Sequence, residues 1–260
     1  AKPFFERYFA LTEPSLRGWA NSCALIGCLL GAAAAGKLSD RFGRKRLLIF
    51  SALLFAATSA GIGTSESFLI FVVWRILGGV AIGLASNLSP MYIAEITPAR
   101  IRGRMVAINQ IAIVGGIAAS AFVNYFIAKG GDQAWLEATG WRWMFAAGIL
   151  PAVLFALLLI PIPESPRWLA KNGQRDRALG VLSRIGGPSG AQQAIAAIEA
   201  TLANEIVLIR LLSFRFWPHF VPLIVSQAML GLGGAGAVWA ALRFGRSRRQ
   251  KMRGQLDPAG

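Results

Sequence analysis

Two polar side chains stand inside long apolar stretches of the sequence, where an unpaired polar group is costly. Gln110 lies in a run without charged residues from 105 to 128. Its amide both donates and accepts hydrogen bonds, which suits vicinal hydroxyl groups, and it must face either a wet cavity or a neighbouring helix. Arg75 lies about nine residues from the nearest loop, roughly 13 Å along a helix. A charge at that depth indicates a pathway or an ion pair.

Carboxylates stand beside arginines in three polar segments that separate the apolar runs. Arginine binds a carboxylate at two points, so such pairs are suited to latch helix ends together. The alternative explanation for the basic residues is the general excess of Lys and Arg on the cytoplasmic side of a membrane. This excess accounts for the presence of Lys45, Arg46 and Arg104. It does not explain the carboxylates. The candidate latch residues are Asp40, Arg44, Glu95, Arg102, Glu164 and Arg167.

The spacing of charges predicts the elements that carry these residues. Each uncharged run is long enough to cross a bilayer core of about 30 Å as a helix. The sequence therefore predicts an all-α, multi-pass transmembrane helical bundle, with Arg75 inside the third span, near 68–94. The uncharged runs cover residues 18–36, 47–65, 76–94, 105–128 and 143–163.

Composition excludes several other classes of protein. The chain has 27 Lys+Arg and 12 Asp+Glu, a net charge of +15, yet it is 55% hydrophobic and only 15% charged. A nucleic-acid partner would need a water-soluble body, so we expect a lipid bilayer as the partner and no nucleic acid. Cys23, Cys28 and a single histidine, His219, predict neither a disulfide framework nor a metal site, and we expect no cofactor. We also expect no enzyme, because no nucleophile–base pair or phosphate loop is present.

The basic loops predict the orientation in the membrane. The loops at 37–46 and 95–104 and the segment 164–212 are basic, whereas the loop between 65 and 68 is not. Basic loops stay in the cytoplasm, so we expect residues 1–17 to lie on the outer side of the membrane. Residues 18–163 are expected to form five spans. Residues 164–212 are expected to form cytoplasmic linker helices with a break at residues 186–188.

Several motifs in order resemble the sugar porter family of the major facilitator superfamily. They are GKLSDRFGRKR, RILGGVAIGLASNLSPMYIAEITPARIRGRMVAINQ, GDQAWLEATGWRWMF and PESPRWL. Xylose–proton symporters and hexose carriers are the most similar members. The resemblance implies part of a twelve-span fold, in which the five spans of this chain match the second to the sixth. It also implies a monosaccharide substrate, either a pentose or a hexose, and a proton as possible coupling ion. The expected location is the plasma (inner) membrane.

The resemblance also implies roles for individual residues. It places Gln110 in contact with the sugar. It also places Ile117, seven residues further along the chain, on the sugar-binding face. At the position of Ile117, xylose symporters tend to carry a second glutamine and facilitative hexose carriers an isoleucine. It pairs Arg75 with an aspartate of the first span for proton coupling. It places Asp40, Arg44, Glu95, Arg102, Glu164 and Arg167 in a cytoplasmic gate.

Two features depart from the family pattern. The family's first span is expected before residue 1, and residues 213–260 form an atypical, doubtful hydrophobic helix with a basic tail instead of the seventh span. Two hypotheses follow: transport of a monosaccharide by alternating access, or a truncated or degenerate membrane protein that does not transport. A third hypothesis is that the basic tail binds anionic lipid or nucleic acid.

Overall fold

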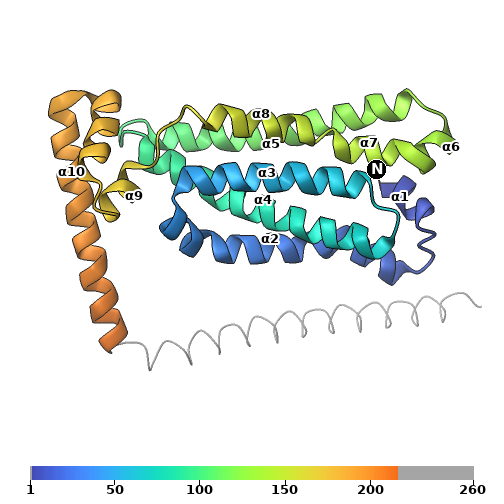
Figure 1. The fold of residues 1–260 in the computed structure, drawn as a ribbon, viewed down its shortest axis with the longest axis horizontal. Coiled ribbons are helices and arrows are strands. Elements are labelled where there is room, and N and C mark those ends of the chain that lie inside the picture. Colours follow the sequence, from blue (N-terminus) through green and yellow to red (C-terminus); the bar gives the residue numbers. More distant parts are fainter. Residues whose placement is uncertain (1, 216–260) are drawn as a thin grey trace, which may run out of the picture. The chain divides into compact units, whose positions relative to one another are not determined.

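The computed structural model describes residues 2–215, and every regular element among them is a helix. Figure 1 shows their arrangement, with the long helices of residues 14–159 running side by side. The elements are α1 (Lys2–Tyr8), α2 (Pro14–Phe42), α3 (Arg44–Gly63), α4 (Phe68–Ile96), α5 (Arg102–Lys129), α6 (Gln133–Trp135), the π-helix η1 (Leu136–Gly140), α7 (Trp141–Ala146), α8 (Ile149–Leu159), α9 (Pro166–Lys171) and α10 (Arg175–Arg215).

Five helical segments are long and apolar enough to cross a membrane, as the uncharged runs predict. They are α2, α3, α4, α5 and the continuous stretch from α6 to α8, Gln133–Leu159. α2, α4 and α5 extend beyond the uncharged runs at both ends, whereas α3 and α8 end before their runs do. α2 begins at Pro14, inside the segment 1–17 that we expected outside the spans. The prediction of an all-α multi-pass membrane protein is confirmed.

Small residues bring α2 and α4 into backbone contact. Gly27 and Gly31 of α2 face Gly79 and Gly83 of α4, and a Cβ atom on any of the four would collide with a backbone carbonyl of the opposite helix. Such spacing of glycines, four apart on both helices, lets two backbones approach closely in lipid, where packing and not the hydrophobic effect drives association. This crossing fixes the position of Arg75, which lies on α4 beside it.

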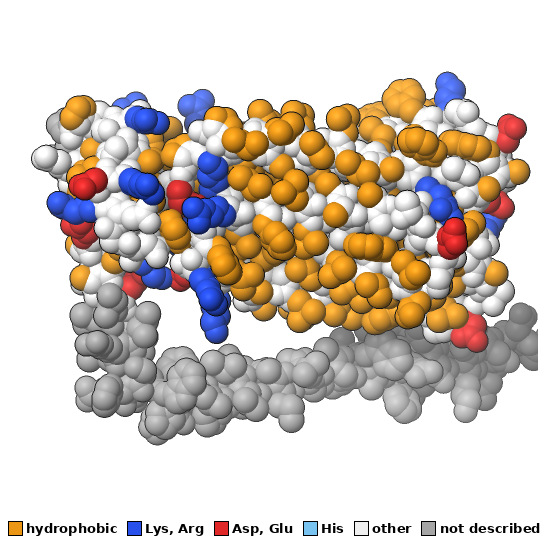
Figure 2. All heavy atoms as spheres, in the orientation of Figure 1, with side chains coloured by type: hydrophobic (Ala, Val, Ile, Leu, Met, Phe, Trp, Pro, Cys, Tyr) orange, Lys and Arg blue, Asp and Glu red, His pale blue; other side chains and the backbone are white. Residues whose placement is uncertain are grey.

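The other spans pack around α4 to different degrees. α3 contacts α4 on one side and α7 and α8 on another, and it buries ten residues. α5 contacts α4, α7 and η1, yet none of its residues is buried. Figure 2 shows the consequence on one face: apolar side chains cover the middle band, and charged side chains gather toward the two ends. That distribution is the one a bilayer core requires.

The polar segment after α8 forms two further helices. α9 is short, and Gly173, at a positive φ of 73°, separates it from α10. α10 is interrupted at Gly187, where φ is 78° and ψ is 167°, within the expected Gly186-Gly187-Pro188 break. The chain divides into two compact units, residues 1–199 and 200–260, and all five spans belong to the first. The segment 213–260 that we expected to depart from the family lies almost wholly outside the described residues.

Candidate functional site

A buried ion pair joins two spans at the end of the bundle that carries the basic loops. Arg44, the first residue of α3, is only 5% exposed. Its Nε lies 3.0 Å from Oε2 of Glu95, near the end of α4, and its Nη2 lies 3.1 Å from Oε1. A cation at a helix N-terminus and an anion at a C-terminus are each disfavoured by the helix dipole. The two charges therefore depend on each other, and the two-point pair holds α3 to α4.

Asp40 extends this pair to two more helices. Its Oδ1 lies 3.0 Å from Nη1 of Arg44, and its Oδ2 lies 2.7 Å from Nζ of Lys171 on α9. The backbone oxygen of Asp40 also accepts a hydrogen bond of 2.9 Å from the indole of Trp168. The last turn of α2 is thereby connected to both α3 and α9.

Glu164 occupies the N-terminus of α3. Its Oε1 accepts hydrogen bonds of 3.0 Å from the backbone N–H groups of Lys45 and Ser165. An anion is favourable there because the first N–H groups of a helix have no partner within the helix. Gly43 makes the approach possible: its φ is 95°, and a Cβ at this position would collide with the Glu164 carboxylate.

Ser165 links the ion pair to α9. It is fully buried, and its hydroxyl donates a hydrogen bond of 2.6 Å to Oε2 of Glu95. The hydroxyl oxygen of Ser165 itself accepts a hydrogen bond of 3.3 Å from the backbone N–H of Trp168. Ser165 is thus both the N-cap of α9 and a partner of the latch. We define the inner network as Asp40, Arg44, Glu95, Glu164, Ser165, Trp168 and Lys171.

The other two expected gate residues lie at the start of α5 and on α9. Arg102 is the first residue of α5, is exposed, and forms no ion pair or hydrogen bond with the described part of the chain. Arg167 lies on α9 and is half-buried. The sequence missed Ser165, Trp168 and Lys171, although Ser165 before Pro166 is a recognisable start of a helix.

Arg75 lies toward the opposite end of α4 and is held by aromatic rings. Its guanidinium carbon lies 5.8 Å from the ring centroid of Phe71 and 5.7 Å from that of Phe145. Its Nη2 donates a hydrogen bond of 3.1 Å to the backbone oxygen of Asn21, and its buried Nε has no partner in the described residues. No carboxylate within residues 2–215 pairs with Arg75. The rings hold the cation in place and leave donors available to an anion.

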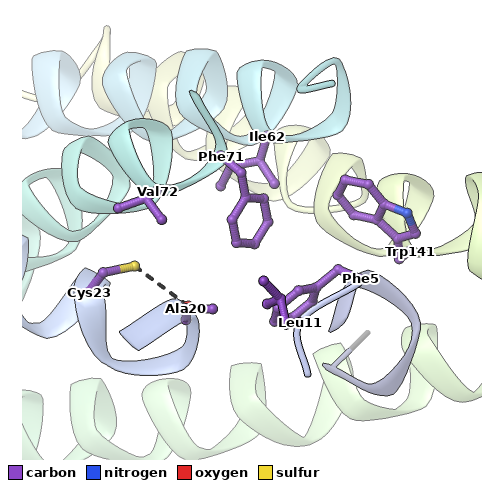
Figure 3. Packing of buried hydrophobic residues seen from close by; sticks show 8 residues of the cluster. All are labelled: Phe5, Leu11, Ala20, Cys23, Ile62, Phe71, Val72 and Trp141. Atoms are coloured by element: carbon purple, nitrogen blue, oxygen red, sulfur yellow. Dashed lines mark hydrogen bonds between the residues drawn. The ribbon is translucent and has the colours of Figure 1, made fainter. Parts of the chain in front are cut away.

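The segment before α2 covers this region. Figure 3 shows Phe5 and Leu11 beside Phe71 and Trp141 in one apolar cluster, with Cys23 at its edge. The ring centroids of Phe5 and Phe71 are 5.0 Å apart. The sequence assigned residues 1–17 no contact with the spans, because aromatic residues in a short segment do not reveal their partners.

Two arginines fasten this covering segment to the start of the last span. Arg7 of α1 forms an ion pair with Glu137 of η1. Arg142 of α7 donates hydrogen bonds to the hydroxyl of Tyr8, at 2.8 Å, and to the backbone oxygen of Gly63, at 3.1 Å. The C-terminal end of α1 is therefore anchored to η1 and α7.

Gln110 and Ile117 lie on α5, seven residues apart and on one face. Gln110 is exposed and its amide bonds to no described residue, and Ile117 is 66% exposed. The hydrogen bond between α4 and α5 is made by the neighbour, Asn109, whose Oδ1 accepts from Ser89 at 3.1 Å. The amide of Gln110 is thus open to a ligand.

Comparison with known proteins identifies the family. The model of the family described as "Sugar (and other) transporter" matches residues 5–237. The chain belongs to the sugar transporter family. This family match continues past Leu212 into the segment that we expected to be atypical.

Among members of the sugar transporter family, the D-xylose-proton symporter of Escherichia coli is 44% identical over 206 residues, which cover 72% of this chain and 42% of that protein. The arabinose-proton symporter of Bacillus subtilis is 40% identical over 202 residues, 78% of this chain and 43% of that protein. The chain thus spans less than half the length of these relatives.

Solved structures agree with this assignment to the sugar transporter family. The proton:xylose symporter XylE of the major facilitator superfamily, bound to 6-bromo-6-deoxy-D-glucose, matches with a TM-score of 0.76 and 42% identity, over 82% of this chain and 50% of that chain. A partially occluded inward-open form of XylE from E. coli matches with a TM-score of 0.71. The expectation of a partial major facilitator fold is confirmed.

Proposed function

We propose that this chain forms part of a proton-coupled monosaccharide carrier that works by alternating access. The observation that carries the proposal is the buried Arg44–Glu95 pair at one end of a five-span bundle that matches half of a solved proton:xylose symporter. A carrier needs helix ends that can be latched and released, and a two-point ion pair between helix ends provides such a latch.

The inner network is the proposed cytoplasmic gate. Its contacts join α2, α3, α4 and α9, so they favour the conformation in which these helix ends lie together, which in the proposal is the outward-facing state. Arg102 and Arg167 belong to the same proposed gate, and Arg102, exposed at the start of α5, needs a partner beyond the described residues. Weakening the latch is expected to shift the population toward the inward-facing state.

The sugar is proposed to bind along the exposed face of α5. Gln110 offers a free amide that can donate to one hydroxyl and accept from its neighbour, and Ile117 lines the same face without polar groups. An apolar group at this second position favours a hexose as much as a pentose, because it adds no hydroxyl-specific contact.

Arg75 is the proposed coupling residue. Its guanidinium is held by two rings and one carbonyl and lacks a carboxylate partner in residues 2–215. A carboxylate that pairs with Arg75 when ionised and releases it when protonated would make the position of α4 depend on the proton. The loops at 37–46 and 95–104 and the linker 164–212 are proposed to be cytoplasmic, in the plasma (inner) membrane.

A chimera tests the proposal. The segment of the E. coli D-xylose-proton symporter that this chain matches is replaced by the matching residues of this chain, and uptake of labelled D-xylose and D-glucose into proteoliposomes is measured. We expect saturable uptake of at least one sugar, and little uptake by the 260-residue chain alone, which spans less than half of its relatives. A folded, membrane-inserted chimera without uptake would favour the alternative of a non-transporting membrane protein.

A further inference from the structure

A groove of about 520 Å³ lies where the C-terminal end of α5 meets α6, α7 and α8, away from the inner network. Its walls are almost entirely apolar, and they include Ile127, Trp135, Trp143, Ala146 and Ala147. No described polar side chain points to a sugar-like ligand there. The chemistry of the walls fits a hydrocarbon chain.

Two tryptophans line the groove. Trp135 packs its ring over Gly131 and Gly140, where a Cβ at either position would collide with the indole. Trp143, on α7, is 59% exposed and lines the groove from the other element. Packing on the two glycines therefore fixes the side of the groove that Trp135 forms.

The position of the groove identifies what covers it. α5 and the stretch Gln133–Leu159 are both membrane spans, and the groove lies near the end of the first and the start of the second, on the side opposite the basic loops. Tryptophan is enriched at this level of a bilayer because its ring is apolar and its N–H is polar. The groove thus faces the outer leaflet.

A lysine stands where a lipid headgroup would lie. Lys129 ends α5, is exposed, and precedes Gly130, which lines the groove. No ion pair joins it to Asp132, and Glu137 is already paired with Arg7. Arg142, which precedes Trp143, is occupied by Tyr8 and Gly63. Among the described residues that adjoin the groove lining in the sequence, Lys129 thus offers an ammonium without a described partner.

We propose that this groove binds one glycerophospholipid of the outer leaflet, with an acyl chain between Trp135 and Trp143 and the phosphate at Lys129. Apolar walls at membrane depth and a free cation at the headgroup level complement the two parts of such a lipid. The proposal does not depend on transport of a sugar.

Lipid retention and tryptophan quenching test the site in the 260-residue chain. After purification in detergent, native mass spectrometry is expected to show one retained phospholipid. Ala146→Phe, which fills the groove, is expected to lower its retention severalfold. Ala57→Phe, the same change at an exposed position of α3, is expected to leave retention unchanged. Equal retention by the parent and Ala146→Phe would overturn the proposal.

Two further variants keep the test decisive if Ala146→Phe does not fold. In vesicles of dibrominated phosphatidylglycerol, Trp143→Phe is expected to remove a strongly quenched component of the fluorescence. Lys129→Gln is expected to weaken binding of phosphatidylglycerol about fivefold, the worth of one surface cation, whereas Lys37→Gln at the other end of the bundle is expected to have no effect. Absence of quenching at Trp143 would show that protein covers the groove, and equal binding by Lys129→Gln and the parent would also contradict the proposal.

Discussion

The hydroxyl of Ser165 donates a hydrogen bond of 2.6 Å to the same oxygen of Glu95 that Nε of Arg44 contacts at 3.0 Å. One carboxylate oxygen thus receives a bond from α3 and a bond from the N-cap of α9. The Glu95 carboxylate therefore connects α9 to the α3–α4 ion pair, and we expect the docking of α9 to depend in part on this contact.

Ser165→Ala is expected to loosen α9 without unfolding the spans. The variant loses the N-cap of α9, worth about 1 kcal/mol, together with the bond to Glu95. Amide hydrogen exchange in residues 166–171 should rise by roughly fivefold or more. Ser183→Ala removes a hydroxyl that bonds only to its own helix at Gly180 and serves as the control. Unchanged exchange in Ser165→Ala would contradict the coupling.

A double-mutant cycle should show strong coupling between Arg44 and Glu95. The two side chains are only 6% and 10% exposed, so Arg44→Leu leaves the Glu95 carboxylate buried without its cation and should cost about 3–5 kcal/mol of unfolding free energy. Glu95→Leu should cost less, because Asp40 still pairs with Arg44. The double variant should lose far less than the sum. The exposed pair Arg175–Glu199, at 60% and 45%, is the matched control and should couple by at most about 1 kcal/mol. Additive losses at Arg44 and Glu95 would show that the pair is no latch.

The α2–α4 crossing predicts opposite effects for two glycines of one helix. Gly31→Ala places a methyl group against the carbonyl of Val80 and should destabilise the protein by about 1–3 kcal/mol. Gly36→Ala meets no atom within 4 Å and should stabilise α2 by about 0.5–1 kcal/mol. Thermal unfolding in detergent measures both. Equal effects of the two substitutions would mean that the helices do not cross at Gly31.

Cys23 reports whether α1 covers the aromatic cluster. Its side chain is fully buried in the cluster that Phe5 and Leu11 complete. In a Cys28→Ser background, Phe5→Ala should speed labelling of Cys23 by a membrane-impermeant maleimide severalfold, because the truncation weakens the packing of α1 on the cluster that contains the thiol. Phe122→Ala, at a 65% exposed position of α5, is the control. Labelling that is equally slow in Phe5→Ala would contradict a covering role for α1.

The sequence predicted the spans because their signal is local. Uncharged runs such as 47–65 and 105–128 report directly on the length of bilayer that a helix must cross, and α3 and α5 follow them closely. The carboxylates beside arginines also pointed to latches, and Arg44 and Glu95 do meet.

Contacts between distant parts of the chain could not be predicted in this way. Ser165 and Glu95 are 70 residues apart, and Lys171 and Asp40 are 131 apart, so their pairing depends on how α9 docks. Nothing in the composition of residues 1–17 indicated that Phe5 would pack on Phe71. Arg102 has a local signal like that of Arg44, but the start of α5 does not bring it to a described carboxylate.

Proton movement that accompanies sugar uptake tests the central claim most directly. The pH inside vesicles that contain the chimera is recorded while D-xylose or D-glucose is added outside. Vesicles with the parent E. coli symporter are the positive control. We expect acidification of the vesicle interior together with saturable sugar uptake, and loss of both in Gln110→Ala. If the inserted chimera gives neither signal while the parent symporter gives both, the chain does not form part of a proton-coupled sugar carrier.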